Sequence, residues 1–353
     1  MKAFGYLQAA SPAQAIDAVS ADPSAVFLGG GTNLVDLMRL GVAVPTAVVD
    51  ISRLSPDIAP LDTGGLRIGA GVRNSDLAGD LRIRRDYPVL SQALLSGASG
   101  QLRNMATIGG NLLQRTRCGY FQDVSKPCNK RQSGSGCPAR SGNHRDLGVI
   151  GTSAACIATH PSDMAVALVA LDALVVVQGP GGIRRLQLDE LYRLPGDDPT
   201  RDTTLAHGEL ITAVELPAAS PLSCRSAYRK ARDRASYAFA VGSVAAAITV
   251  VDDRVDDVRL AFGAVAPRPW RARIAEDAIR GGPVTGEAFA AALADEFAAA
   301  EPLPGNAFKV PLAQNLGVAV LSELAGIVSE GYAELGQAAT DGPSGQPDGP
   351  GRS

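Results

Sequence analysis

The sequence of 353 residues has little of the charge imbalance or apolar length that would direct a protein to a nucleic acid or into a membrane. Its 33 Lys and Arg residues against 36 Asp and Glu residues leave a net charge of −3, so no basic surface for nucleic acid is expected. No apolar run approaches the roughly 20 residues of a membrane span. The N-terminus breaks into a polar helical pattern too soon for a signal peptide. The compartment therefore stays open: cytoplasmic, or periplasmic by export with a signal-bearing partner.

Motifs for several common chemistries are also missing. The only histidines are His144, His160 and His207, which argues against a multi-histidine metal site. No G-x-G-x-x-G, Walker A or nucleophile-elbow sequence is present, which argues against a Rossmann NAD site, a P-loop and a Ser-His-Asp hydrolase. The composition, 46% hydrophobic and 20% charged, is that of an ordinary globular protein with room for about two to three domains.

Cysteines are few but strongly grouped. Four of the five, Cys118, Cys128, Cys137 and Cys156, fall within 39 residues, and only Cys224 lies elsewhere. The segment between them is rich in Gly, Ser, Pro and basic residues and has no apolar periodicity, so it predicts a long loop. A loop of this length needs a bound group or cross-links to order it. An iron–sulfur cluster or a zinc ion on four thiolates would do so. Disulfides are the third reading; a core this large should not depend on them, and the spacing fits no short zinc ribbon.

A glycine-rich turn follows the first apolar strand pattern. Residues 25–28 predict a strand, Gly29, Gly30 and Gly31 follow at once, and residues 34–39 read as a helix start. Strand, glycine turn and helix start aim backbone N–H groups at a phosphate. A tight turn that only packs a helix on a sheet is the alternative. An earlier helix is expected at 11–21, with Ser11 as cap and Pro12 in the first turn.

Two more polar segments support a dinucleotide. A second glycine pair, in residues 106–112, follows a helical pattern over residues 88–95, and two glycine turns suit a pyrophosphate approached from two sides. Residues 159–163 directly precede a helical run over 164–173. Asp163 occupies a position where helix capping is the structural alternative to ligand binding.

Together these segments resemble the FAD-binding (medium) subunits of the molybdenum hydroxylases, the group of xanthine dehydrogenase, carbon monoxide dehydrogenase and aldehyde oxidoreductases. The likeness extends to about residue 330, and the cysteine loop is most similar to that of the flavin subunit of bacterial periplasmic aldehyde oxidoreductase, which carries a [4Fe–4S] cluster. The matching pieces are FLGGGTNLVDLM (27–38), ATIGGNLLQ (106–114), THPSDMAVAL (159–168), GELITAVELP (208–217) and YRKARDRASYAFA (228–240).

The resemblance implies an α+β fold. Residues 1–57 and 58–217 would form the two lobes of a FAD-binding domain of the vanillyl-alcohol-oxidase (PCMH) type, with the Fe–S loop at 115–156. Residues 222–330 would form a C-terminal domain like that of the CO dehydrogenase flavoprotein. Strands at 244–251 and 258–262, joined by a turn at Asp252 and Asp253, and helices at 286–300 and 315–329 are expected there. Residues 335–353 have little apolar content and should be disordered.

The resemblance also assigns residues to the two cofactors. The first turn would wrap the FAD pyrophosphate, and the second turn would complete the cradle. Asp163 would contact the adenosine or phosphate-side hydroxyls, Ile211 a ring system, and Lys230 the isoalloxazine. The FAD set is Phe27, Leu28, Gly29, Gly30, Gly31, Thr32, Asn33, Leu34, Thr107, Gly110, Asn111, Asp163, Ile211 and Lys230. Asn33 stands where many relatives have Asp. The [4Fe–4S] ligands would be Cys118, Cys128, Cys137 and Cys156.

The implied function is electron transfer inside a heterotrimer. A molybdenum subunit would oxidise the substrate, a small subunit with [2Fe–2S] centres would relay electrons, and FAD would pass them to an external acceptor. No residue here would act on substrate. Charge supports the cluster, because the segment 115–145 has seven basic side chains and a single acidic one, Asp123, and cations stabilise a reduced cluster. A stand-alone flavin oxidase and a zinc-bound structural protein are the alternatives.

Overall fold

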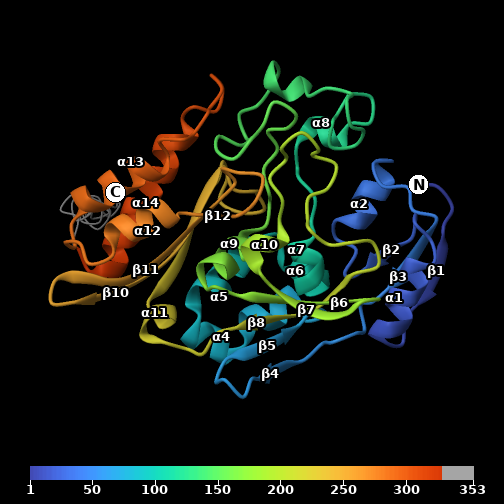
Figure 1. Cartoon of the computed structure of the whole chain (residues 1–353), viewed down its shortest axis with the longest axis horizontal. Helices are drawn as coiled ribbons and strands as arrows, with labels where there is room; N and C mark the ends of the chain where they lie inside the picture. The colour runs from blue at the N-terminus through green and yellow to red at the C-terminus, as the bar shows by residue number, and fades with distance from the viewer. Residues whose placement is uncertain (328–353) are drawn as a thin grey trace, which may run out of the picture.

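The computed structural model describes residues 1–327, which form three separate sheets lying side by side (Figure 1). The first sheet is parallel, in the order β1 (Gly5–Gln8), β3 (Ala47–Asp50) and β2 (Val26–Leu28). Helix α1 (Pro12–Ser20) packs its apolar side beside it, and α2 (Leu34–Arg39) follows the glycine turn. Ser11 caps α1 by accepting from the N–H of Gln14, as the sequence predicts.

The second sheet is antiparallel and holds the largest core. Its order is β4 (Ile58–Pro60), β5 (Leu66–Gly69), β8 (Leu210–Leu216), β6 (Leu174–Gly179) and β7 (Gly182–Gln187). Its helices are α3 (Asn74–Gly79), α4 (Leu81–Asp86), α5 (Pro88–Ser96), α6 (Gly100–Met105), α7 (Ile108–Leu112), α9 (Asp163–Ala170) and α10 (Leu188–Leu191). Every residue of α9 after Asp163 is buried. This helix is therefore enclosed on all sides and fixes the position of Asp163 at its start.

The third sheet is also antiparallel, in the order β12 (Trp270–Arg271), β11 (Arg254–Gly263), β10 (Gly242–Val251) and β9 (Ser226–Ala231). Helices α11 (Pro221–Cys224), α12 (Arg273–Ile279), α13 (Gly286–Glu296) and α14 (Lys309–Ala325) accompany it. The predicted hairpin turn is present, with Asp252 and Asp253 at φ angles of 49° and 57°. Two successive positive φ angles match the right-handed twist of the strands they join.

The cysteine loop arches over the sheets at the top of Figure 1 and contains only α8 (Gly119–Gln122) and a 3-10 turn at Pro138–Arg140. Its end is held by the C-terminal domain. The fully buried Asn306 donates from Nδ2 to the carbonyl oxygens of Leu147 (3.3 Å) and Gly148 (3.1 Å). The fully buried Lys309 donates to Leu147 as well, at 2.9 Å. These hydrogen bonds anchor the end of the cysteine loop to the C-terminal domain.

Other sequence expectations are met with shifted boundaries. The expected helices at 88–95 and 164–173 are α5 and α9, but the side chain that caps α9 is Ser162, with Asp163 as the first helical residue. The helix expected at 315–329 begins at Lys309, because Pro311 in a first turn forfeits no helical hydrogen bond. It ends at Gly326, whose φ of 78° closes the helix. The helix expected at 286–300 ends at Glu296.

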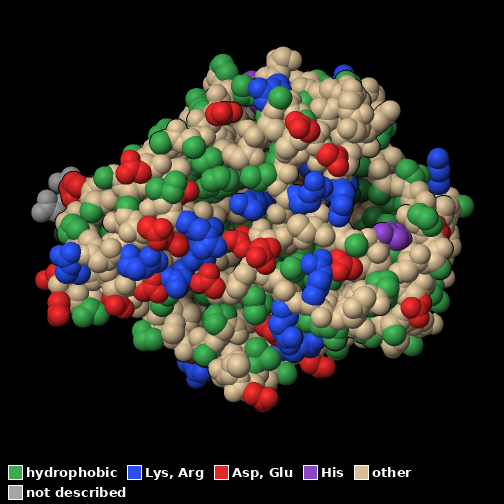
Figure 2. All heavy atoms as spheres, viewed as in Figure 1, with side chains coloured by type: hydrophobic (Ala, Val, Ile, Leu, Met, Phe, Trp, Pro, Cys, Tyr) green, Lys and Arg blue, Asp and Glu red, His purple; other side chains and the backbone are tan. Residues whose placement is uncertain are grey.

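The sequence also predicts a disordered C-terminal tail, no membrane span and no basic surface. The disordered tail expected at 335–353 lies outside the described residues. Within residues 1–327 no helix combines the length and the apolar character needed to cross a bilayer. On the face shown in Figure 2, acidic and basic side chains are interspersed.

Candidate functional site

The first glycine turn presents a row of backbone donors that the protein does not use. None of the N–H groups of residues 29–33 donates a hydrogen bond to another described residue. Gly31 has a φ of 74°, which only glycine adopts without strain, and the whole turn is half-buried. Successive free N–H groups beside a helix start are an anion-binding arrangement. The predicted residues Phe27, Leu28, Thr32 and Leu34 frame this turn at the end of β2 and the start of α2.

The second glycine segment, expected as a turn, forms the short helix α7 capped by Thr107, and the start of this second turn of the chain packs directly on the first glycine turn. A Cβ atom on Gly30 would lie 1.9 Å from the carbonyl oxygen of Met105, and one on Gly29 would lie 2.7 Å from Oγ1 of Thr107. The donors of the second turn are already engaged. Gly109 donates to the carbonyl of Ala70 (2.9 Å), and Gly110 donates to Thr107 Oγ1 (3.2 Å). The first turn is therefore the one with donors to spare, and the second fixes its position.

A cavity of about 340 Å³, part of it open to solvent, lies against these turns. Four of the predicted FAD residues line it: Gly29, Thr107, Gly110 and Ile211. The sequence reading missed the other walls, which are Pro12, Ile51, Leu54, Ser55, Ala70, Gly71, Gly109, Leu210 and Thr212. One signal was available in Gly69-Ala70-Gly71 at the end of β5, since alternating glycines often mark close backbone approach. A Cβ on Gly71 would lie 1.9 Å from the carbonyl oxygen of Leu54.

Asn33 and Asn111, the two asparagines of the predicted FAD set, differ in the hydrogen bonds of their side-chain amides. Asn33 Oδ1 accepts from the backbone N–H of Arg115 at 2.8 Å, while its buried Nδ2 has no partner among the described residues. A buried donor without a partner is costly and marks a place where a ligand acceptor fits. Asn111 Oδ1 accepts from Ser162 (2.6 Å) and Gln114 (2.9 Å), which ties the second turn to the cap of α9.

Asp163 and Lys230 lie together and are not among the residues that line the cavity. Lys230 Nζ donates to Asp163 Oδ2 at 2.8 Å and to the carbonyl oxygen of Ser96 at 3.1 Å. The hydroxyl of Tyr228 donates to Asp163 Oδ1 at 2.5 Å. Burial raises the pKa of Tyr228 well above its usual value, and the neighbouring carboxylate acts in the same direction. The charge of Lys230 is therefore balanced by a carboxylate of the FAD-binding half.

The four clustered cysteines surround a second cavity, of about 300 Å³. Cys118, Cys128, Cys137 and Cys156 all line it, and all five cysteines of the chain are free thiols, so the disulfide reading does not describe this structure. No group of three or more ligating side chains in residues 1–327 is close enough to hold a metal ion. Zinc would draw its sulfurs to within about 4 Å of one another, whereas a four-iron cluster is larger and keeps its thiolates farther apart.

Two thiols of this cavity, those of Cys118 and Cys156, are buried in apolar surroundings. Burial raises the pKa of Cys118, and it raises that of Cys156 to about 11, although the nearby Lys130 acts in the opposite direction. Ser135 accepts from the N–H of Cys128 at 3.0 Å, and Arg131 donates to the carbonyl oxygens of Tyr120 and Phe121. A thiolate would need a counter-charge here, which a metal group provides.

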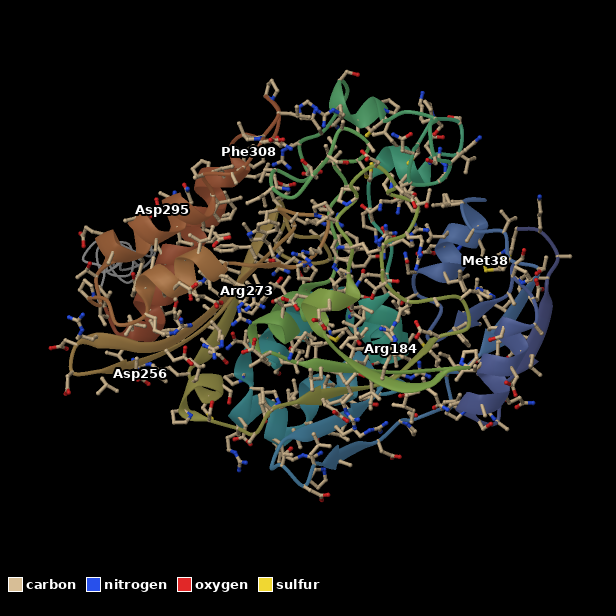
Figure 3. All side chains as sticks on the ribbon, viewed as in Figure 1. Met38, Arg184, Asp256, Arg273, Asp295 and Phe308 are labelled. Carbon is tan, nitrogen blue, oxygen red and sulfur yellow. The ribbon has the colours of Figure 1, made fainter. Side chains whose placement is uncertain are left out.

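The loop also meets the C-terminal domain through an aromatic contact. Phe308, labelled in Figure 3 just before α14, lies on the side of that domain that faces the loop, and the guanidinium of Arg145 stands 5.3 Å from its ring centroid. Arg145 also pairs with Asp233 at 2.8 Å. The predicted basic loop is thus partly neutralised by carboxylates from outside its own sequence.

Comparison with known proteins identifies the family. Residues 2–219 match the family model described as the FAD binding domain in molybdopterin dehydrogenase. The chain belongs to this family. Residues 226–324 match the CO dehydrogenase flavoprotein C-terminal domain. The family, the FAD-binding function and the α+β fold class predicted from the motifs are confirmed.

Similarity to individual proteins supports the same family and fold for this chain. It is 54% identical to the aldehyde oxidoreductase FAD-binding subunit PaoB of Escherichia coli K12, over 78% of this chain and 86% of that one. It is 26% identical to the glyceraldehyde dehydrogenase medium chain of Sulfolobus acidocaldarius, over 79% of this chain and 81% of that one. CO dehydrogenase from Oligotropha carboxidovorans superposes with a TM-score of 0.72 at 21% identity, covering 93% of this chain and 99% of that one, so the fold is shared.

Proposed function

We propose that this chain is the electron-transfer subunit of a heterotrimeric molybdenum hydroxylase of the aldehyde oxidoreductase type. The observation that carries the proposal is the 54% identity to an aldehyde oxidoreductase FAD-binding subunit over 86% of that protein. At such identity over nearly a whole subunit, the partner surfaces as well as the fold tend to be shared. We also propose the division into residues 1–57, 58–217 and 222–330, which the three separate sheets support.

FAD would be held chiefly by the first turn. The free N–H groups of residues 29–33 and the unpartnered Nδ2 of Asn33 are suited to the pyrophosphate oxygens. Thr107 packs against that turn, Gly110 lines the cavity, Asn111 secures the second turn, and Ile211 offers an apolar wall. Asp163 and Lys230 would lie beside the ligand as a fixed, balanced pair. When bound, FAD exchanges electrons singly or in pairs and so links one-electron carriers to two-electron acceptors.

The four-cysteine cavity would hold a [4Fe–4S] cluster. Four free thiols that line one cavity support this assignment over disulfides. The thiols are too far apart to share one zinc ion, and a four-iron cluster spans a larger distance. When bound, such a cluster takes up or releases one electron. The chain's residues contribute the four ligands, the apolar wall from Phe121 and Ile157, and a cation, Lys130.

The partners would be a small subunit with [2Fe–2S] centres and a large subunit with the molybdenum cofactor, while an external acceptor takes the electrons from FAD. The sites found in residues 1–327 fit cofactors, and none combines an acid, a base and a substrate cavity. We therefore assign substrate oxidation to the large subunit. Nucleic acid and membrane play no part in this proposal.

Co-purification tests the proposal directly. A tag on this chain in its native host should recover two further subunits, and the complex should contain molybdenum and [2Fe–2S] iron from those subunits. This chain should add one FAD and about four irons. The complex should oxidise aldehydes, and the isolated chain should not. Oxidation of a small substrate by the isolated chain would instead establish a stand-alone flavin oxidase. Zinc without iron on the isolated chain would refute the cluster.

A further inference from the structure

A group of three charged side chains, of which Lys130 is buried and Arg115 and Asp202 are partly buried, lies between the first glycine turn and the four-cysteine cavity. Lys130 Nζ contacts the carboxylate of Asp202 and donates to the carbonyl oxygen of Pro199 at 3.1 Å. Arg115 Nε contacts the other oxygen of the same carboxylate. Burial alone would raise the pKa of Asp202, but Arg115 and Lys130 outweigh it and hold that pKa below its usual value. The three side chains therefore form one cation–anion–cation group.

Each end of this group touches a different site. Lys130 lines the cysteine cavity, and its side chain is only 8% exposed. The guanidinium of Arg115 lies 4.9 Å from the ring centroid of Phe121, which also lines that cavity, while its backbone N–H donates to Asn33 of the first turn. A single carboxylate thus balances the cation beside the thiols and the residue attached to the phosphate-binding turn.

Lys130 differs from the other cations of the loop. Lys126, Arg140 and Arg145 are exposed, and the guanidinium of Arg131 donates hydrogen bonds to backbone carbonyl oxygens. Exposed charges are screened by water and salt and act weakly on a neighbour. Lys130 is buried and lines the same cavity as Cys128 and Cys156. Among the residues that line the cavity, Lys130 is the one cation.

We infer that Lys130 and Asp202 act as an opposed pair that sets the reduction potential of the group held by the four cysteines. The inference rests on the proposed [4Fe–4S] cluster. Addition of one electron makes the cluster more negative, so a buried cation favours the reduced state and a buried anion disfavours it. Lys130 and Asp202 are positioning residues here, because neither supplies a ligand.

The test is a redox titration of the purified full complex, with dithionite as reductant and the cluster followed by its EPR signal. Lys130→Gln should favour the oxidised state about tenfold, a fall of about 59 mV for a one-electron couple. Asp202→Asn should shift the equilibrium severalfold toward the reduced state. Lys126→Gln, the same change at an exposed site of the same loop, should shift it less than twofold.

The opposite shifts in reduction potential expected for Lys130→Gln and Asp202→Asn distinguish an electrostatic effect from a loss of structure. A merely structural role would move both variants in the same direction, or would remove iron from both, and either result overturns the inference. If Lys130→Gln alone loses iron, Asp202→Asn decides: a rise in potential supports the inference and any other result rejects it. Wild-type complex without four-iron signal would refute the cluster proposal itself before any variant is made, and this inference with it.

Discussion

Lys230 and Asp163 join the two family domains through a buried ion pair. The Nζ and Oδ2 atoms lie 2.8 Å apart, with only 3% and 10% of the side chains exposed. Asp163 begins α9, which is buried along its length, and Lys230 lies on β9 of the third sheet. The pair therefore connects a rigid helix of the FAD-binding half to the edge strand of the C-terminal sheet.

Removal of that lysine should be costly. Lys230→Met leaves Asp163 buried with only the Tyr228 hydroxyl and without a cation, which typically costs about 3–5 kcal/mol. We expect lower stability in urea unfolding together with loss of bound FAD. Arg229→Met is the matched control on the same strand, since its ion pair with Glu323 is exposed and should be worth about 1 kcal/mol or less. Equal losses in the two variants would contradict this account of the pair.

Gly30 should tolerate no side chain at all. Its Cβ position lies 1.9 Å from a carbonyl oxygen of the second turn, and backbone cannot move aside cheaply. Gly30→Ala should therefore separate the two turns, with a loss of FAD and a destabilisation of about 2 kcal/mol or more. Gly100→Ala, where nothing lies within 4 Å, is the control and should leave both quantities nearly unchanged. FAD content by absorbance and thermal unfolding decide the matter.

The parts of the fold that the sequence predicted are those controlled by neighbours in the chain. Ser11 and Pro12 fix the start of α1, and Asp252 with Asp253 fixes the hairpin, because cap and turn chemistry acts over a few residues. The strained residue of the glycine turn was not identified. Three glycines in succession give no local signal of which one takes a positive φ, and the structure has it at Gly31. Gly30 is needed for close packing with Met105 instead.

The parts that could not be predicted depend on residues far apart in sequence. Asp202 lies 72 residues from Lys130 and 87 from Arg115, so a count of charges within the loop could not include it. The loop therefore looked more basic in sequence than its surroundings make it. The same holds for Asp163 and Lys230, which were each expected to contact the ligand and which the structure pairs with one another.

Exchange of one cavity cysteine should remove iron selectively. Cys128→Ser takes away one of four thiols around the second cavity, so we expect loss or instability of the cluster. Most FAD should be retained, because no residue of the first turn lines that cavity. Cys224 is exposed at the end of α11, away from that cavity, so Cys224→Ser is the control and should keep its iron. Iron and flavin assays on both variants check this. Full iron in Cys128→Ser would mean that another set of ligands is used.

His160 should make the protein sensitive to acid. Its ring is buried 4.5 Å from that of Tyr192, and burial lowers its pKa to about 4, against roughly 6.5 in an unfolded chain. Between these values the unfolded state binds a proton that the folded state does not, so stability falls as the pH drops from about 6.5 to 4 and this contribution levels off below. The loss amounts to about 3 kcal/mol. His160→Asn keeps an acceptor for the N–H of Ser162 and cannot titrate, so the difference in urea stability between wild type and variant should narrow across this range. A difference that stays constant from pH 7 to pH 4 would show that His160 titrates alike in both states.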